Sequence, residues 1–559
     1  MSHSITYPWF LNRHLELAAA LKTNCSLLLH DAVHFPYCYC IFTYKEHPMT
    51  APSKFASGLS WNTLTVVLQV VIQLVYTGLF ARLVTPDAFM LMGLVLSIMG
   101  FAEIFSQVGV GPALIQRKEI HQQHINGAFY TALLLGLLFT VSFLVAAPSI
   151  ANFYSLPELE PLTRMVCTSF TISALAVVPR NMMMKEMRFR TMFKASMISI
   201  VGGNLVVGLS LAYLGYGVWA YAWALFAQNT LMTLALWYYQ RIPITAGWQW
   251  KYTAELMRYG VGSTLFNSLN YLATKLDVMI IPRCMAPGGT PLTETQINSA
   301  AQYERANYAM SQPITIMGKL SDSVLFSGMA AMQDNTQQLR RTFLIATNLL
   351  GLVMWPVAGF IFFYAQPLIF LWLGDRYAEA GNILRILFFV AVLRTLSKLC
   401  DSLLRAKDHL MLGSLIKAFY VSALFVAIWL TIDQGMKAVA WAVVLATALH
   451  YLLNVFLALR ILQLPLKNLL RAWMPAWLIG LCSFAWTAAT WMVLSSIAHN
   501  MFVLLLLGSA AWALGLLAII YMVPWLLGGQ HINPLFVLPE KLKALKPVKS
   551  MINKLEKKA

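Results

Sequence analysis

Fourteen apolar stretches, each long enough to cross a lipid bilayer, follow one another between Gly58 and Leu527. A helix needs about 20 mostly apolar residues to span the hydrocarbon core. The composition agrees, since 59% of the residues are hydrophobic and 11% are charged. No connection is long enough to fold as a separate domain, so the sequence predicts an all-α integral membrane protein with 14 transmembrane helices. The predicted spans are residues 58–84, 88–108, 124–147, 162–181, 192–214, 217–239, 259–281, 303–326, 342–364, 380–403, 409–431, 436–459, 472–496 and 501–526.

The basic residues that give the chain its net charge of +18 are distributed unevenly over the connections. With the first connection placed outside, 24 Lys and Arg residues fall on the inner connections and the C-terminal tail, and only Arg283, Arg376 and Lys437 fall outside. This bias follows the positive-inside rule. It predicts that both termini are cytoplasmic, and it accounts for the basic charge without a nucleic-acid partner. The tail at 528–559 is expected to contact anionic membrane lipids.

The first 56 residues form an extension before the first span. Within it, Lys22, Asn24, His30 and Asp31 interrupt the apolar character of residues 15–33, so no signal-peptide core is predicted there. Met49 opens a polar lead into the first helix, and residues 1–48 are therefore predicted to be disordered or not made. The seven cysteines have no regular ligand spacing, so neither a disulfide framework nor a metal site is predicted.

An internal repeat of about 200–220 residues indicates two related halves. The segment Gly217-Val-Trp-Ala-Tyr-Ala-Trp-Ala opens the sixth span, and Gly435-Met-Lys-Ala-Val-Ala-Trp-Ala opens the twelfth, with five of eight positions identical. Pro148 and Pro367 follow the third and ninth spans at nearly the same offset. Six spans per half is an even number, so both copies share one orientation. The sequence predicts two parallel six-helix lobes around a central cavity, followed by two further helices. The predicted divisions are an N-lobe at 57–241, a C-lobe at 255–461, spans 13 and 14 at 468–527, and a basic cytoplasmic tail at 528–559.

Several segments resemble the Wzx-type polysaccharide flippases of the multidrug/oligosaccharidyl-lipid/polysaccharide exporter superfamily, most closely the colanic-acid-type exporters. The resemblance lies in residues 81–89, 100–117, 184–190, 275–283 and 301–306. The chain departs from the family pattern at Met92 and in a long insertion between Pro287 and Ser299.

The resemblance implies a transporter rather than an enzyme. It would flip undecaprenyl-diphosphate-linked oligosaccharide repeat units across the bacterial inner membrane by alternating access, for exopolysaccharide or O-antigen-type biosynthesis. It implies no cofactor, although coupling to H⁺ or Na⁺ is expected. A polysaccharide polymerase and glycosyltransferases are candidate protein partners.

Ionisable residues inside the spans are the candidate functional residues, because a charge in hydrocarbon is costly. A lipid diphosphate or an acidic sugar requires fixed positive charge, which Arg supplies through two parallel hydrogen bonds. The candidate ion-coupling residues are Asp277 and Glu103. The candidate substrate-binding residues of the central cavity are Arg394, Lys275, Arg305, Lys398 and Lys319.

The sequence leaves structural roles open for several of these residues. Lys319 with Asp322, and Lys398 with Asp401, are spaced to pair along one helix face. Arg305 has the position of a side chain that reaches toward the membrane surface. Arg394 has no acidic residue three or four positions away, which makes it the best single anion-site candidate. Asp277 is expected either to orient Lys275 or to take part in ion coupling.

Other function classes also fit a polytopic chain. A multidrug or cation antiporter of the same superfamily needs acidic residues for cationic substrates, whereas here the charges within the spans are mainly basic. A membrane glycosyltransferase, polymerase or ligase normally carries a sizeable outer loop, and the first outer connection is only about Thr85–Ala88. A flippase for peptidoglycan precursors is a further alternative, which differs in being essential for growth.

The predicted orientation can be tested with reporter fusions. Alkaline phosphatase fused after Gly288 is expected to be active, because the positive-inside rule places this connection outside. A fluorescent protein fused after Ala559 is expected to fluoresce in the cytoplasm. An outer location for Ala559 would contradict the scheme.

Overall fold

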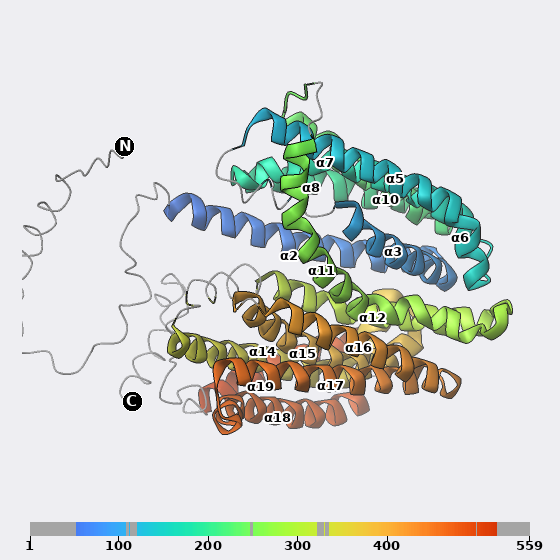
Figure 1. Cartoon of the computed structure of the whole chain (residues 1–559). Coiled ribbons are helices and arrows are strands. Elements are labelled where there is room, and N and C mark those ends of the chain that lie inside the picture. The colour runs from blue at the N-terminus through green and yellow to red at the C-terminus, as the bar shows by residue number, and fades with distance from the viewer. Residues whose placement is uncertain are drawn as a thin grey trace, which may run out of the picture. The chain divides into compact units, whose positions relative to one another are not determined.

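The computed structural model describes residues 52–107, 120–245, 250–320, 335–407, 409–498 and 500–522, together with the single positions 111, 114, 329 and 332. The chain divides into two units, residues 1–56 and residues 57–559, and the fold described below belongs to the second unit. The predicted extension at 1–48 lies outside the described residues. The described part is helical (Figure 1).

The helices fall into two sets along the chain. An N-terminal group comprises α2 (Pro52–Leu83), α3 (Pro86–Gln107), α5 (Gln122–Tyr154), α6 (Leu159–Val166), α7 (Thr168–Lys185), α8 (Phe189–Ile200), the π-helix η1 (Val201–Gly208), α9 (Leu209–Tyr213) and α10 (Val218–Tyr239). A C-terminal group comprises α11 (Trp250–Met285), η2 (Pro287–Gly289), α12 (Glu294–Leu320), α14 (Thr336–Leu373), η4 (Asp375–Tyr377), α15 (Ala378–Ala406), α16 (Leu410–Thr431), η5 (Ile432–Gln434), α17 (Met436–Leu462), α18 (Leu466–Ile497) and α19 (Met501–Met522).

Ten helices in the described residues are long and apolar enough to cross a membrane. Long described helices that do not meet this criterion are α10, α11, α12 and α15. Helix α10 is rich in Trp and Tyr, and the other three carry most of the candidate site residues. The chain is therefore an all-helical membrane protein in which the least apolar helices coincide with the expected site.

The positions that match in the sequence repeat also match in structure. Gly217 and Gly435 each precede the first residue of a helix, α10 and α17, with positive φ angles of 55° and 92°. Only glycine adopts such angles without steric cost. Pro148 lies six residues before the end of α5, and Pro367 lies six residues before the end of α14. Both copies of the repeat therefore place the same helix-start glycine and the same late-helix proline.

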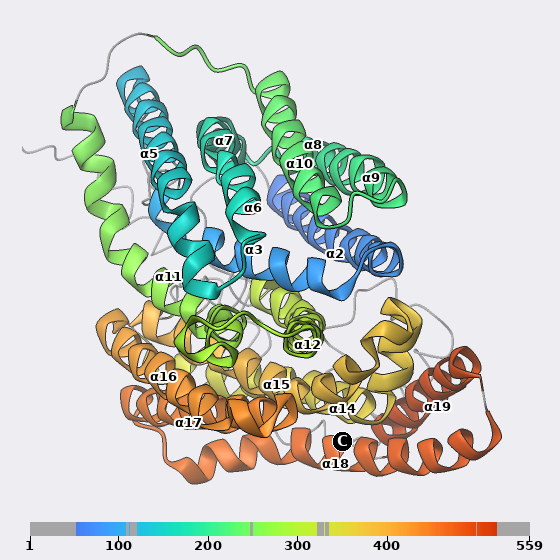
Figure 2. The same cartoon turned by 90° about the vertical axis from the view of Figure 1, so that its right-hand side faces the viewer.

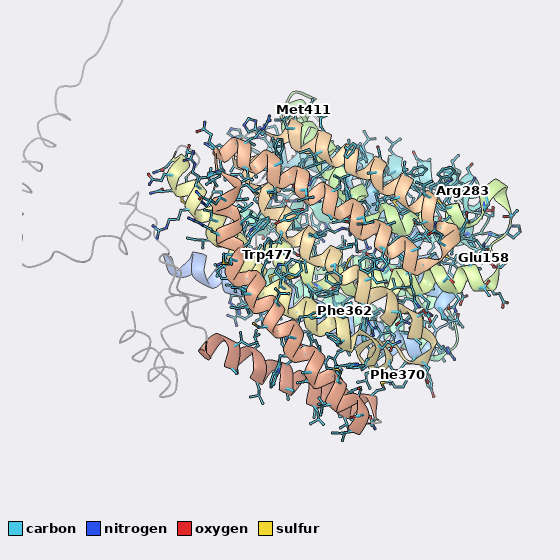
Figure 3. The ribbon with its side chains drawn as sticks, turned by 90° about the horizontal axis from the view of Figure 1, so that it is seen from below. Glu158, Arg283, Phe362, Phe370, Met411 and Trp477 are labelled. Atoms are coloured by element: carbon cyan, nitrogen blue, oxygen red, sulfur yellow. The ribbon has the colours of Figure 1, made fainter. Side chains whose placement is uncertain are left out.

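The polar helices of the C-terminal group pack against other helices of the group. Helix α15 contacts α12, α14 and α17, while α11 contacts α16 and α18 lies along α14 (Figures 1 and 2). Exposed side chains of the surrounding helices are often large and apolar, as at Met411 of α16 and Trp477 of α18 (Figure 3). Lipid offers no hydrogen-bond partners, so the outer surface is apolar and polar side chains lie between helices.

The two groups meet where α2 passes into α3, which we call the α2–α3 end. Trp372 Nε1 of α14 donates to Leu74 O of α2 at 2.7 Å, and Arg82 Nη2 donates to Leu371 O at 2.6 Å. Gly78 allows this approach, since a Cβ there would lie 2.8 Å from Trp372. Helix α3 also packs against both α11 and α12. These contacts close the α2–α3 end in the conformation described.

The unusual insertion after Pro287 is ordered by local hydrogen bonds. Thr293 N donates to Gln296 Oε1 at 2.9 Å, and Gln296 N donates to Thr293 Oγ1 at 3.4 Å. This reciprocal pair is a capping box at the start of α12. Gln296 Nε2 also donates to Met285 O at 3.0 Å, which ties the start of α12 to the end of α11. The insertion therefore ends in a capped helix that brings Glu304 and Arg305 to the α2–α3 end.

Candidate functional site

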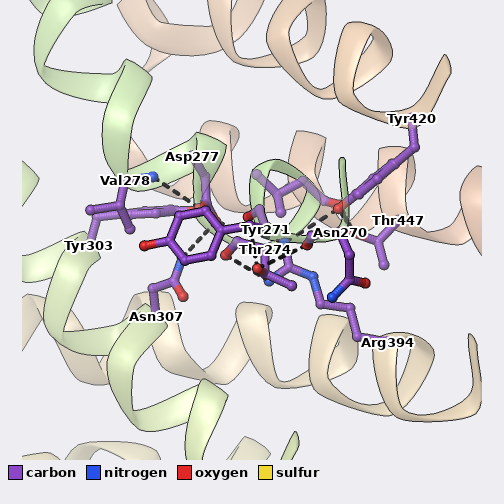
Figure 4. A network of polar contacts seen from close by, with 11 residues as sticks. Asn270, Tyr271, Thr274, Asp277, Val278, Tyr303, Asn307, Arg394, Tyr420 and Thr447 are labelled. Carbon is purple, nitrogen blue, oxygen red and sulfur yellow. Dashed lines mark hydrogen bonds and ion pairs between the residues drawn. The ribbon is translucent and has the colours of Figure 1, made fainter. Parts of the chain in front are cut away.

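A buried network of polar contacts surrounds Asp277 of α11 (Figure 4). Its carboxylate is 1% exposed, and Oδ2 accepts hydrogen bonds from Tyr303 Oη at 3.0 Å and Asn307 Nδ2 at 2.6 Å. Oδ1 accepts from Val278 N at 2.9 Å. A carboxylate held by three donors is well satisfied in a low-dielectric site. Asp277 forms no hydrogen bond or ion pair with Lys275 in the described ranges, so its three hydrogen-bond donors are all other residues.

Arg394 of α15 joins the same network from the opposite side. Its Nη2 atom lies 4.0 Å from Asp277 Oδ2 and donates to Tyr420 Oη at 3.3 Å, while Nη1 lies 3.5 Å from Thr274 O. Tyr420 Oη and Thr447 Oγ1 are 3.0 Å apart, which extends the network to α17. The residue is 8% exposed. The sequence excluded an acidic partner along α15, and the structure places one on α11, because adjacent helices supply partners that spacing along one helix does not show.

A second buried ion pair lies elsewhere in the C-terminal group. Lys417 Nζ of α16 donates to Asp401 Oδ2 of α15 at 2.6 Å and stands 4.8 Å above the ring of Phe266. Lys398 instead donates to Ile314 O of α12 at 3.4 Å, where Gly318 leaves room for its ammonium group. The ion pair that the structure shows for Asp401 is thus with Lys417 on the next helix.

Arg305 of α12 is buried rather than extended toward the membrane surface, so that expectation is also wrong. It is 1% exposed and forms an ion pair with the adjacent Glu304, which is 7% exposed. Its guanidinium lies 4.1 Å from the ring centroid of Phe89 on α3 and 4.9 Å from that of Tyr308. Both distances are within the range of cation–π contacts. Arg305 therefore sits in the contact between the two groups of helices.

Lys275 and Glu103 lie on helices that face each other across the same contact. Lys275 is half-buried and forms no hydrogen bond or ion pair with another residue in the described ranges. It lies one helical turn after Tyr271, whose hydroxyl donates to Leu96 O of α3 at 3.4 Å. Glu103 of α3 interacts electrostatically with Tyr271 and with Arg180 of α7. Lys275 and Glu103 thus both lie near Tyr271, where α3 packs against α11.

The structure does not gather all the predicted cations at one point. Arg394 belongs to the Asp277 network, Arg305 to the α3–α12 contact, and Lys398 to the α12–α15 contact. The side chains of Lys319 and Asp322 lie outside the described residues. No cluster of metal-ligating side chains occurs within the described ranges.

Sequence reasoning missed Glu304, Tyr303 and Tyr420. Glu304 is an acidic residue next to a candidate arginine in a predicted span, and that adjacency was a usable signal. The two tyrosines gave no signal, because a tyrosine in an apolar helix usually packs with its hydroxyl near the membrane surface. Their role becomes visible only in the structure, where each hydroxyl hydrogen-bonds to a side chain of another helix.

An apolar cavity of about 870 Å³ opens between α2, α12, α14, α15 and α19. Leu74, Leu371, Phe388 and Phe502 are among its lining side chains. Polar groups at its wall include Arg82, Gln312 and Ser509. A cavity of this size with so few polar groups suits a long apolar chain.

Comparison with known proteins decides the family. The family model described as "Polysaccharide biosynthesis protein" matches residues 79–382, which is more than half of the chain. The chain belongs to this Wzx-like polysaccharide flippase family. The chain is 24% identical over 446 residues to the lipopolysaccharide biosynthesis protein WzxC of Escherichia coli (strain K12), covering 77% of this chain and 86% of that protein. It is 23% identical over 450 residues to the teichuronic acid biosynthesis protein TuaB of Bacillus subtilis (strain 168), covering 78% and 89%.

Solved structures of two membrane transporters share the fold. The lipid II flippase MurJ in an inward closed conformation aligns with a TM-score of 0.67 at 12% identity, covering 84% of this chain and 99% of MurJ. An inward-facing multidrug resistance transporter of the MATE family aligns with a TM-score of 0.57 at 15% identity, covering 72% and 98%. The family is one of membrane transporters in polysaccharide biosynthesis and not of enzymes. The chain is accordingly a multi-pass membrane protein homologous to bacterial inner-membrane flippases.

The Asp277–Arg394 contact gives a stability prediction. Asp277→Ala is expected to destabilise the protein by about 3–5 kcal/mol, because it leaves the Arg394 guanidinium buried without its counter-ion. Thermal unfolding in detergent measures the change. Lys275→Ala, which removes a lysine on the same helix without a partner in the described residues, is the matched control and should have little effect. Equal unfolding temperatures for the two variants would contradict the assignment.

Proposed function

We propose that this chain flips undecaprenyl-diphosphate-linked oligosaccharide repeat units across the bacterial inner membrane, for exopolysaccharide or O-antigen-type biosynthesis. The observation that carries the proposal is the position of the apolar cavity beside a buried guanidinium. Trp372 lines the cavity, the ring of Tyr308 stacks on it at 6.2 Å, and Arg305 lies over Tyr308. This arrangement, an apolar cavity followed by two aromatic rings and then a guanidinium, matches a ligand with a long apolar chain and an anionic head group.

The chemistry of such a ligand explains why a protein is needed. Each sugar hydroxyl moved into hydrocarbon without a partner costs roughly 4–8 kcal/mol on an alkane-like scale. A repeat unit carries many hydroxyls, so unaided flipping is negligible. A polar path between helices removes most of this cost, while the lipid chain stays in an apolar groove. The diphosphate is best held by guanidinium and ammonium groups.

We further propose that the two repeat halves act as lobes that move against each other. In this scheme the N-lobe is 57–241, the C-lobe is 255–461, and all 14 helical stretches span the membrane with both termini cytoplasmic. The α2–α3 end then faces outward and is closed in the conformation described. Substrate would enter between the lobes from the cytoplasmic side and leave when the α2–α3 end separates.

The predicted site residues receive roles within this scheme. Arg305, Lys275, Lys398 and Lys319 supply positive charge to the diphosphate or to an acidic sugar. Arg394 joins them when it is released from Asp277. A proton or Na⁺ bound at Asp277 would weaken its attraction for Arg394, so we assign ion coupling to this carboxylate, with Glu103 as a second coupling group.

Names of relatives support a polysaccharide pathway without specifying the glycan. One relative is named for teichuronic acid biosynthesis, and another is the succinoglycan biosynthesis transport protein ExoT of Rhizobium meliloti (strain 1021). By this analogy, a polysaccharide polymerase and glycosyltransferases remain the proposed protein partners.

Transport in proteoliposomes tests the proposed function. The purified full chain should move a fluorescent undecaprenyl-diphosphate-linked oligosaccharide from the inner to the outer leaflet, where an added glycosidase or quencher reaches it. Undecaprenyl-free fluorescent phospholipid serves as the control for leaky membranes. Equal movement of both lipids, or movement of neither, would contradict the proposal.

Arg394 gives a sharper prediction in the same assay. Arg394→Ala should abolish transport while the protein accumulates, because Asp277 keeps its hydrogen bonds from Tyr303 and Asn307. Arg394→Lys should restore transport only in part, since an ammonium does not reproduce the planar fork of a guanidinium. Full transport by Arg394→Ala at a normal protein level would remove Arg394 from the site.

A further inference from the structure

The ion pair between Glu304 and Arg305 leaves part of the guanidinium without a partner. Successive residues of an α-helix point about 100° apart, so these two side chains must bend toward each other to meet. Arg305 Nε and Nη2 both donate to one oxygen, Oε2 of Glu304. Arg305 Nη1 is buried and has no hydrogen-bond partner among the described residues. The guanidinium is therefore neutralised but not fully hydrogen-bonded.

Two tyrosine hydroxyls near this pair are also unpaired. Tyr76 of α2 and Tyr377 of η4 are buried, and the hydroxyl of each lacks a partner within the described ranges. Both tyrosines interact electrostatically with Arg305. A buried donor without a partner is energetically costly, so each of these three groups calls for an explanation. An oxyanion is bound by a cation together with hydroxyl and N–H donors.

The pair also lies where the two groups of helices separate. Tyr76 and Phe89 belong to the N-terminal group, whereas Glu304, Arg305 and Tyr377 belong to the C-terminal group. Glu304 packs directly on α3, since a Cβ at Gly93 would lie 2.7 Å from Glu304 Cγ. Opening of the α2–α3 end would withdraw α3 from Glu304 and admit water or a ligand to Arg305.

We propose that Glu304 is a positioning residue that competes with the substrate for Arg305. It neutralises the guanidinium while the α2–α3 end is closed, and it yields the guanidinium to an oxyanion of the glycolipid when this end opens. On closure Glu304 recovers Arg305 and thereby expels the oxyanion. Because the Glu304 carboxylate always competes for the guanidinium, the oxyanion binds Arg305 weakly enough to be released. The inference rests on the proposed function and adds an internal competitor to it.

Removal of the competing charge should strengthen binding and slow release. With Glu304→Gln, the full chain in nanodiscs is expected to bind undecaprenyl diphosphate about tenfold more tightly, a change of about 1.4 kcal/mol. Its dissociation should slow by a similar factor. Undecaprenol, which lacks the diphosphate, should bind with unchanged affinity, and this separates competition from a general loosening of the α2–α3 end.

Matched variants define the readout. Glu294→Gln removes an exposed carboxylate from the first turn of the same helix and should leave both affinities unchanged. Arg305→Gln should lose the preference for the diphosphate. Glu304→Asp replaces Glu304→Gln if that variant fails to fold. The shorter aspartate side chain reaches the guanidinium less well, so diphosphate affinity should rise, but by less than in Glu304→Gln. Competition by inorganic diphosphate or by glucuronate identifies whether Arg305 receives the phosphate or a sugar carboxylate.

Different results would overturn different claims. Absence of undecaprenyl diphosphate binding by the unaltered chain would reject the proposed function. Binding by Arg305→Gln equal to that of the unaltered chain would reject Arg305 as a ligand. Normal binding by the unaltered chain, loss in Arg305→Gln and unchanged or weaker binding in Glu304→Gln would reject the competitor role alone, even if that variant melted at a lower temperature.

Discussion

The absence of water in the hydrocarbon core governs this structure, because every polar group within a span must find its partner inside the protein. The helices with the most polar groups, α11, α12 and α15, are accordingly packed against other helices. Their polar side chains are satisfied mainly by neighbouring helices, as Asp277 is by Tyr303, Asn307 and Arg394. The apolar helices can face lipid because they have few such requirements. Burial of the polar helices thus creates the site and also determines which helices surround it.

Three buried ion pairs differ in whether they connect two helices or lie on one. Asp277 and Arg394 join α11 to α15, and Asp401 and Lys417 join α15 to α16. Separation of these helices would leave buried charges unpaired, at a cost of several kcal/mol. Glu304 and Arg305 lie on one helix, so movement of that helix does not by itself pull them apart. The cross-helix pairs therefore resist deformation within the C-terminal group, whereas the intrahelical pair permits movement between the two groups.

The sequence predicted the positions of the helices because hydropathy, proline and glycine act locally. The apolar stretches, the helix-start glycines Gly217 and Gly435, and the late prolines of the repeat are all readable along the chain. Partners across helices are not readable in this way. Spacing suggested that Lys398 pairs with Asp401, whereas Asp401 forms an ion pair with Lys417 on the next helix. The five candidate cations were all selected from one feature, charge in a span. This feature does not distinguish a residue that lines a cavity from one that joins two helices.

The last two helices gain a role from the cavity that they help to form. Helix α18 packs along α14, and α19 contributes Phe502, Leu505 and Leu506 to the cavity wall. These helices lie outside the internal repeat, and the described charged residues of the site all come from helices within it. Under the proposed function, the repeat therefore handles the anionic head, while the added helices cover the lipid chain. This division lets the anionic head group cross between the moving lobes while the lipid chain stays in an apolar groove. The sugars therefore never enter the hydrocarbon of the bilayer without hydrogen-bond partners, which would be costly.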